Sequence, residues 1–127
     1  MIVHQNSNVK IEYDPVTKRL TQTWTGFIVS KEFRIAIDKT VEFVSQNPVV
    51  SIVSDTLNQG VVKPEDTEYA ASVMPAMFSQ GLKKMAFVLP ENIFTQFSLK
   101  RFASKGESES IQYFRTLGEA NDWLSKS

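Results

Sequence analysis

The chain has 127 residues, with 14 Lys or Arg, 14 Asp or Glu, a single His and no Cys. This length fits one domain over residues 1–127 that buries a core without disulfides. A formal net charge of zero provides no field that would attract nucleic acid or an anionic membrane, and the absence of Cys excludes disulfides, thiolate catalysis and thiolate metal sites.

Targeting and cofactor signals are absent from the sequence. The N-terminus has no basic segment before an apolar one, and no apolar run approaches the roughly 20 residues of a membrane span. We therefore expect a soluble, cytoplasmic protein without membrane insertion. A metal site or a catalytic triad would have to use His4, no Gly-x-Ser-x-Gly motif is present, and the five Gly form no phosphate-binding loop. We expect no cofactor and no metal.

The first part of the chain predicts a β-meander. Apolar and polar residues alternate over 9–13, and residues 20–25 are rich in Thr and aromatic side chains. A turn at Asp14-Pro15 separates these two strands, and residues 2–5 suit a further short strand. These segments should form a β-hairpin or a three-strand meander.

A helix and a buried strand follow. Ser30 is a suitable N-cap residue, and apolar side chains recur at helical spacing from there to Asn47-Pro48. The run 49–55 then contains four β-branched residues between two helical patterns. Such a run is typical of a strand that is buried on both faces at the centre of a parallel sheet.

A second helix should begin at Pro64, because Pro suits the first helical position and acidic residues follow it. Its apolar face extends to Phe78, but Pro75 cannot donate an N–H to the carbonyl of Ala71. We therefore expect a bend or break near 71–75, with water or a side chain bonded to that carbonyl. The apolar run 85–89 predicts another parallel strand.

The last third predicts a short helix over 91–104, a polar loop over 105–110 and a strand over 111–114. Thr116 and Glu119 have the spacing of a capping box at the start of a C-terminal helix. The order is a β-meander followed by α-β-α-β-α-β-α. This order predicts an α/β fold in which helices cover a mixed sheet.

Several fragments together resemble the small stand-alone SpoIIAA-like or STAS-type domains common in Bacteroidetes. The resemblance spans nearly the whole chain, and its most specific part is Thr-Trp-Thr-Gly-Phe followed by Ser-Lys-Glu-Phe-Arg. The fragments are Tyr13-Asp14-Pro15, Thr23-Trp24-Thr25-Gly26-Phe27, Ser30-Lys31-Glu32-Phe33-Arg34, Asp55, Pro64-Glu65-Asp66, Pro75, Gly81-Leu82-Lys83-Lys84-Met85-Ala86, Tyr113-Phe114 and Trp123-Leu124.

The resemblance implies the α/β sandwich of anti-sigma-factor antagonists and of the cytoplasmic domains of anion transporters. Antagonists of this type carry a phosphorylatable Ser in an Asp-Ser-Ser-Gly-like motif at the start of the helix after the central strand. The corresponding stretch here is Lys63-Pro64-Glu65-Asp66-Thr67, so the motif is missing. Thr67 has acidic neighbours, which oppose added phosphate.

The candidate ligand or partner surface consists of Asp55, Asn58, Asp66 and Thr67. Asp55 should end the central strand and Asp66 should begin the next helix, so both carboxylates should reach the sheet edge where open α/β folds bind ligands. The alternative is structural: Asp55 accepts backbone N–H bonds from the loop 56–60, and Asp66 favours the helix dipole.

Two functions remain open, and an enzyme ranks third because no catalytic constellation is found. The first is a non-catalytic STAS-like domain that binds a partner protein, or itself as a homodimer through the exposed edge of residues 2–5. The second is a binding module for a small apolar or lipid-like ligand. Nine Phe and four Met, several of them within 69–80 and 93–102, suit an apolar cavity, although such residues also form ordinary cores.

Overall fold

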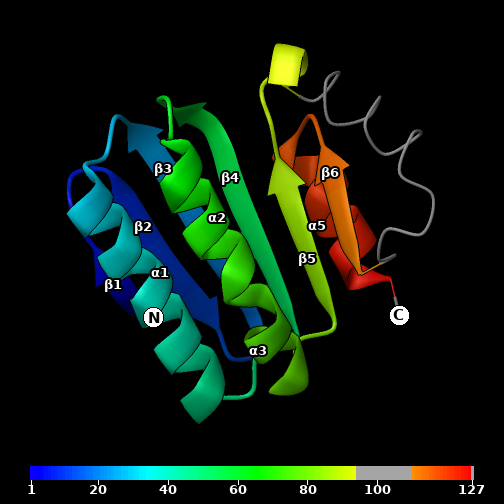
Figure 1. Cartoon of the computed structure of the whole chain (residues 1–127). Coiled ribbons are helices and arrows are strands. Elements are labelled where there is room, and N and C mark those ends of the chain that lie inside the picture. The colour runs from blue at the N-terminus through cyan, green and yellow to red at the C-terminus, as the bar shows by residue number, and fades with distance from the viewer. Residues whose placement is uncertain (94–109, 127) are drawn as a thin grey trace.

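The computed structural model describes residues 1–93 and 110–126. Six strands form one sheet in the order β1-β2-β3-β4-β5-β6, and helices cover both of its faces (Figure 1). The strands are β1 (Ile2–Gln5), β2 (Val9–Asp14), β3 (Arg19–Gly26), β4 (Ser51–Gln59), β5 (Lys84–Val88) and β6 (Ile111–Phe114). The helices are α1 (Ser30–Gln46), α2 (Pro64–Ser72), α3 (Met74–Ser79) and α5 (Leu117–Ser125).

The sheet is mixed, as the sequence predicts. β1, β2 and β3 pair in antiparallel fashion as a meander, whereas β3, β4, β5 and β6 are parallel to one another. The predicted α/β class and element order are confirmed for the part of the chain that the structure describes. The expected helix over 91–104 and the loop over 105–110 fall mainly on residues 94–109, which lie outside the described residues.

Two apolar clusters lie on opposite faces of the sheet. Ile52 belongs to the larger one, under α1, α2 and α3, and its neighbour Val53 belongs to the smaller one, under α5. Both side chains are fully buried, because successive residues of a strand point to opposite faces and each face is covered. The predicted burial of the central strand on both faces is thereby confirmed.

β4 extends four residues beyond the predicted end of this strand. Its pairing with β3 passes from Thr23↔Asp55 to Thr25↔Asn58, so β4 contains a bulge beside Trp24. Asp55 therefore lies within the strand and not at its end, which corrects the expected position. The bulge was not apparent from sequence because the polar residues after Asp55 resemble a loop.

The N-cap of α1 differs from the predicted residue, whereas the N-cap of α5 agrees with it. Val29, and not Ser30, is the N-cap of α1, and no side chain caps that end. The hydroxyl of Ser30 instead donates to a carboxylate of α2, which is a stronger acceptor than a neutral one. At α5, Thr116 Oγ1 accepts from the Glu119 N–H at 3.2 Å, as predicted.

The second helical segment breaks as Pro75 requires. α2 ends at Ser72, Val73 joins the two helices, and Pro75 occupies the first turn of α3, where its missing N–H costs no hydrogen bond. The expected water or side-chain partner for the Ala71 carbonyl is wrong, because the N–H of Val73 donates to it. A short turn of backbone therefore closes the break.

Polar contacts fix α5 to the face of the sheet opposite α1, α2 and α3. Arg19 donates to Ser51 Oγ at 3.3 Å, to Asn121 Oδ1 at 3.0 Å and to Ser125 Oγ at 3.2 Å. Lys84 donates to the carbonyls of Trp123 and Lys126 at the C-terminal end of the helix. Such contacts also satisfy carbonyls that a helix end leaves without partners.

Candidate functional site

Helix α2 covers the sheet without filling the space beneath it. Asp66 is the one residue of α2 that is buried. Thr67, Ala70 and Ala71 are spaced three and four residues apart, so they share the face that looks toward the sheet. Because these three side chains are small, they leave room between the helix and strands β4 and β5.

That room is a cavity of about 700 Å³. Its walls come from both layers of the fold: strands β3, β4, β5 and β6 on one side, and α1, α2 and α3 on the other. Most of the wall is apolar. The larger apolar lining side chains are Trp24, Phe33, Ile37, Met74, Met77, Met85, Phe87, Leu89, Ile93 and Ile111.

The described wall carries no charged side chain; most of its polar groups lie on the sheet and on α1, and Thr67 lies on α2. Gln22 Nε2 donates to Thr40 Oγ1 at 2.9 Å, and Trp24 Nε1 donates to Ser54 Oγ at 3.0 Å. Thr56 Oγ1 donates to the carbonyl of Val88 at 2.7 Å. An apolar cavity with a few fixed polar groups is the usual composition of a small-molecule site.

Polar contacts join α2 to α1, in addition to the apolar packing of Tyr69 and Ala70 on the core. The carboxylate of Asp66 accepts from Ser30 Oγ at 2.7 Å and from Arg34 Nε at 3.0 Å. The hydrogen bond from Ser30, followed by the bond and charge of Arg34, lowers the pKa of Asp66 despite its burial. Asp66 is therefore ionised near neutral pH.

A second pair extends this contact by one helical turn. The hydroxyl of Tyr69 donates to Asp38, and the guanidinium of Arg34 lies 4.8 Å from the centre of the Tyr69 ring. The bond to Asp38 raises the pKa of Tyr69. These contacts add to those that join α2 to α1, next to the cavity.

Asp66→Asn is expected to lower the melting temperature at pH 7, because the amide loses the charge that pairs with Arg34. The lowered pKa of Asp66 means that the ionised carboxylate stabilises the fold above its ordinary pKa of 3.8, and that this contribution is lost as the pH falls through the lower folded value. The difference between parent and variant should shrink in that acidic range. Melting curves from pH 7 to pH 2 would show this, and a constant difference would contradict it.

The four residues predicted as a site do not form one. Asp55 lies two residues after Val53 on β4, so its side chain is on the same face of the sheet, which α5 covers. Its Oδ1 accepts the Leu57 N–H at 3.1 Å. Asn58 is exposed and lies opposite Thr25 on β3. The structural interpretation of Asp55 is thus supported, within a bulge rather than a loop.

Asp66 and Thr67 lie across the sheet from Asp55. The expected meeting of the two carboxylates is corrected, because Asp66 projects from α2 toward α1 on the other face. Thr67 lines the cavity and donates weakly to the carbonyl of Lys63 at 3.4 Å. Of the four candidates, only Thr67 lines the cavity.

Sequence reasoning missed Gln22 and Ser54. Both are buried polar residues on strands whose same-face neighbours include apolar side chains, Leu20 and Trp24 on β3 and Ile52 on β4. A polar residue at an inward position of a buried strand is a signal that could have been used. The sequence cannot say, however, whether such a residue bonds within the core or faces a cavity.

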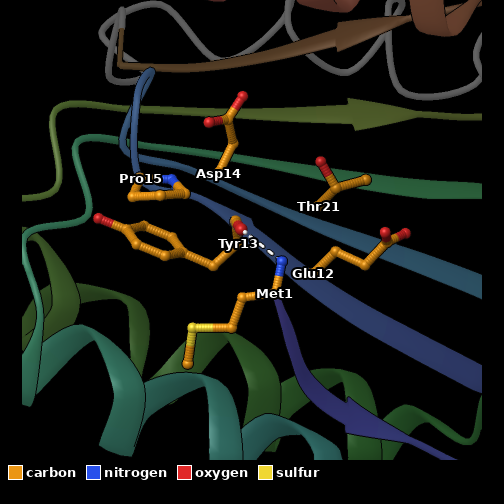
Figure 2. A pocket seen from close by; sticks show the side chains of 6 residues that line it. All are labelled: Met1, Glu12, Tyr13, Asp14, Pro15 and Thr21. Carbon is orange, nitrogen blue, oxygen red and sulfur yellow. Dashed lines mark hydrogen bonds between the residues drawn. The ribbon is translucent and has the colours of Figure 1, made fainter.

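A second hollow of about 360 Å³ lies beside the N-terminus (Figure 2). The amino group of Met1 donates to the Tyr13 carbonyl at 3.2 Å, and Glu12 and Thr21 are register partners on the adjacent strands. This hollow is smaller and more open to solvent than the cavity beneath α2, and its wall is less apolar. It is a weaker candidate than the cavity beneath α2.

Residues 1–93 and 110–126 contain neither a cluster of metal ligands nor a helix suited to a membrane. No group of three or more His, Asp or Glu in this part of the chain is placed to hold a metal ion. No helix within it is both long and apolar enough to cross a membrane.

Comparisons with known proteins define the fold. No family model and no curated protein matches the chain. Among solved structures, it is similar to the crystal structure of an uncharacterized DUF3478-family protein with a SpoIIAA-like fold from Shewanella loihica. The similarity has a TM-score of 0.60 at 14% identity and covers 95% of this chain and 99% of the other. The chain therefore has a SpoIIAA-like fold, and at this identity the likeness supports the fold alone.

Proposed function

We propose that this SpoIIAA-like protein is a non-catalytic module that binds a small apolar ligand in the cavity beneath α2. The observation that carries the proposal is the cavity itself, about 700 Å³ in volume, with an apolar wall and without a charged side chain in its described part. Its volume falls in the range of roughly 300–1,000 Å³ typical of sites for small ligands.

The apolar wall of the space favours an apolar occupant. The space is not a sealed void, since Val61, Thr67 and Ala71 in its wall are exposed, but most of its wall is apolar. Side chains around an empty apolar space lose dispersion contacts, which a ligand of matching shape restores. The large side chains Trp24 and Phe33, whose rings lie 5.2 Å apart, form a rigid part of this wall.

A substitution that fills the cavity tests the proposal. Ala70→Trp puts a large ring into the space from α2, so we expect it to reduce the affinity for the neutral dye Nile red at least tenfold. The matched control is Ala76→Trp, an exposed residue of α3 that does not line the cavity, and it should bind the dye as the parent does. Fluorescence titration measures both affinities.

Circular dichroism spectra should first show that both variants fold like the parent. Equal dye affinity in folded Ala70→Trp and the parent would contradict the proposal, and so would the absence of dye binding by the parent. Equal losses in both variants would place the dye on the outer surface instead.

A partner protein remains the second candidate, and a group of exposed apolar side chains favours it. Phe27 and Val29, between β3 and α1, are 59% and 54% exposed, and Val61, after β4, is 83% exposed. The hydrogen bond from the Gly60 N–H to the Gly26 carbonyl brings these two segments together. Exposed apolar groups of this kind often mark protein contacts.

A second copy of the chain is the simplest such partner, either through this surface or through the outer edge of β1. Light scattering would show a dimer mass in the parent, and Phe27→Ser would return the monomer mass if the surface is responsible. A monomer mass at every concentration would remove the homodimer but not the ligand site.

A further inference from the structure

The hydrogen bonds around Gln22 fix which way its amide points. Thr40 Oγ1 donates its only hydrogen to the Ala36 carbonyl at 3.0 Å, so it must accept from Gln22. The atom that faces Thr40 is therefore the Nε2 donor. The carbonyl oxygen Oε1 faces away from Thr40, and no described residue donates to it.

The same reasoning fixes the hydroxyl of Ser54. The indole N–H of Trp24 can only donate, so Ser54 Oγ accepts at 3.0 Å. The hydrogen of the Ser54 hydroxyl remains available, since no described acceptor takes it. Gln22 and Ser54 are both 3% exposed, and both line the cavity.

These two free groups are neighbours. Gln22 and Ser54 are register partners on the parallel strands β3 and β4, and adjacent strands lie about 4.8 Å apart. The cavity wall therefore includes, on neighbouring strands, one acceptor, Oε1 of Gln22, and one donor, the hydroxyl of Ser54. A single ligand oxygen that carries a hydrogen can satisfy both.

We infer that the ligand is an uncharged molecule with an apolar body and one hydroxyl group, which donates to Gln22 Oε1 and accepts from Ser54. This inference rests on the proposed function and names the class of ligand for the same cavity. A purely apolar ligand would cover these two groups without bonding to them, which costs free energy, so a ligand that supplies both bonds is favoured.

The walls also select against ionised head groups. A carboxylate can accept from Ser54 but cannot donate to Gln22, and no Lys, Arg or His in the described wall would neutralise it. Burial of an unpaired charge is far more costly than burial of a hydroxyl group. A fatty alcohol should thus bind more tightly than the fatty acid anion of the same length.

Displacement of Nile red by three ligands of equal chain length tests the inference: decanol, decyl methyl ether and decanoate. In the parent, decanol should bind about three- to tenfold more tightly than the ether, which cannot donate, and decanoate should bind most weakly. In Gln22→Leu, the ratio of alcohol to ether affinity should fall to about one. Thr40 still donates to Ala36 in this variant, so no core donor is left without a partner.

The outcomes separate the two proposals. If all three compounds displace the dye equally well, or the alcohol-to-ether ratio is the same in Gln22→Leu, the head-group inference is overturned while the apolar site stands. If the dye binds Ala70→Trp as well as the parent, the site itself fails and the inference fails with it. Gln22→Met keeps the length of the side chain and replaces Gln22→Leu if the latter does not fold.

Discussion

Trp24→Ala should lower the free energy of unfolding by about 3–5 kcal/mol, the usual cost of removing a buried aromatic ring. Trp24 is 3% exposed on the central strand β3, where it packs on Phe33 and donates to Ser54. Its loss would merge a new void with the cavity and remove part of the rigid wall. We expect the variant to bind Nile red more weakly as well, because the wider space fits the dye less closely.

Trp24→Phe distinguishes the contribution of the aromatic ring to stability from that of the indole N–H. It retains most of the apolar volume but takes away the donor to Ser54, so its cost should be smaller, about 1–3 kcal/mol. Urea unfolding followed by circular dichroism measures both variants without depending on Trp fluorescence. Equal stability of Trp24→Ala and the parent would show that the ring contributes little to the core.

Leu124→Ala should cost about 2–3 kcal/mol of unfolding free energy and leave dye binding unchanged. Leu124 is 8% exposed and packs from α5 against the face of the sheet opposite the cavity, in the cluster that includes Val53 and Ala86. The central strands separate the two clusters, so a void under α5 does not reach the cavity wall.

Trp24→Ala and Leu124→Ala together test whether the two faces of the sheet have separate roles. The dye affinity of Leu124→Ala is measured at a temperature where the variant is fully folded, to exclude loss through unfolding. A parallel loss of affinity and stability in Leu124→Ala would mean that the cavity depends on the whole sheet. Preserved affinity would show that α5 supports the fold alone, with Arg19 as its polar anchor.

The contact between α1 and α2 links these effects to the proposed site. α2 places small residues over the cavity and its buried carboxylate, Asp66, against Ser30 and Arg34. The contact of α2 with α1 therefore includes an ion pair as well as apolar packing. An ion pair is more sensitive to pH than apolar packing is, because it requires the carboxylate to be ionised.

Most of the architecture was present in the sequence alone. Alternation over 9–13 located β2, the apolar run from Val49 located β4, and Pro64 with its acidic neighbours located the start of α2. Pro75 required a break and the structure has one. These features could be read because each depends on the residue itself or on neighbours within one helical turn or strand.

The site depended on contacts between distant residues. Ser30 has the composition of an N-cap, yet the carboxylate of Asp66, 36 residues later, is the partner of its hydroxyl. The polar residues after Asp55 predict the end of a strand, whereas the pairing of β3 with β4 shows a bulge there. In both cases a local preference worth about 1 kcal/mol gave way to a tertiary contact.

Whether the cavity exists depends on tertiary structure and not on local sequence. The sequence shows that Ala70 and Ala71 are small and that Gln22 and Ser54 are polar, but each is compatible with a filled core. In the folded protein Asp66 and Tyr69 bond to α1, and a space remains between α2 and the sheet. Composition determines which side chains line a space, whereas the separation of the packed layers determines whether the space exists.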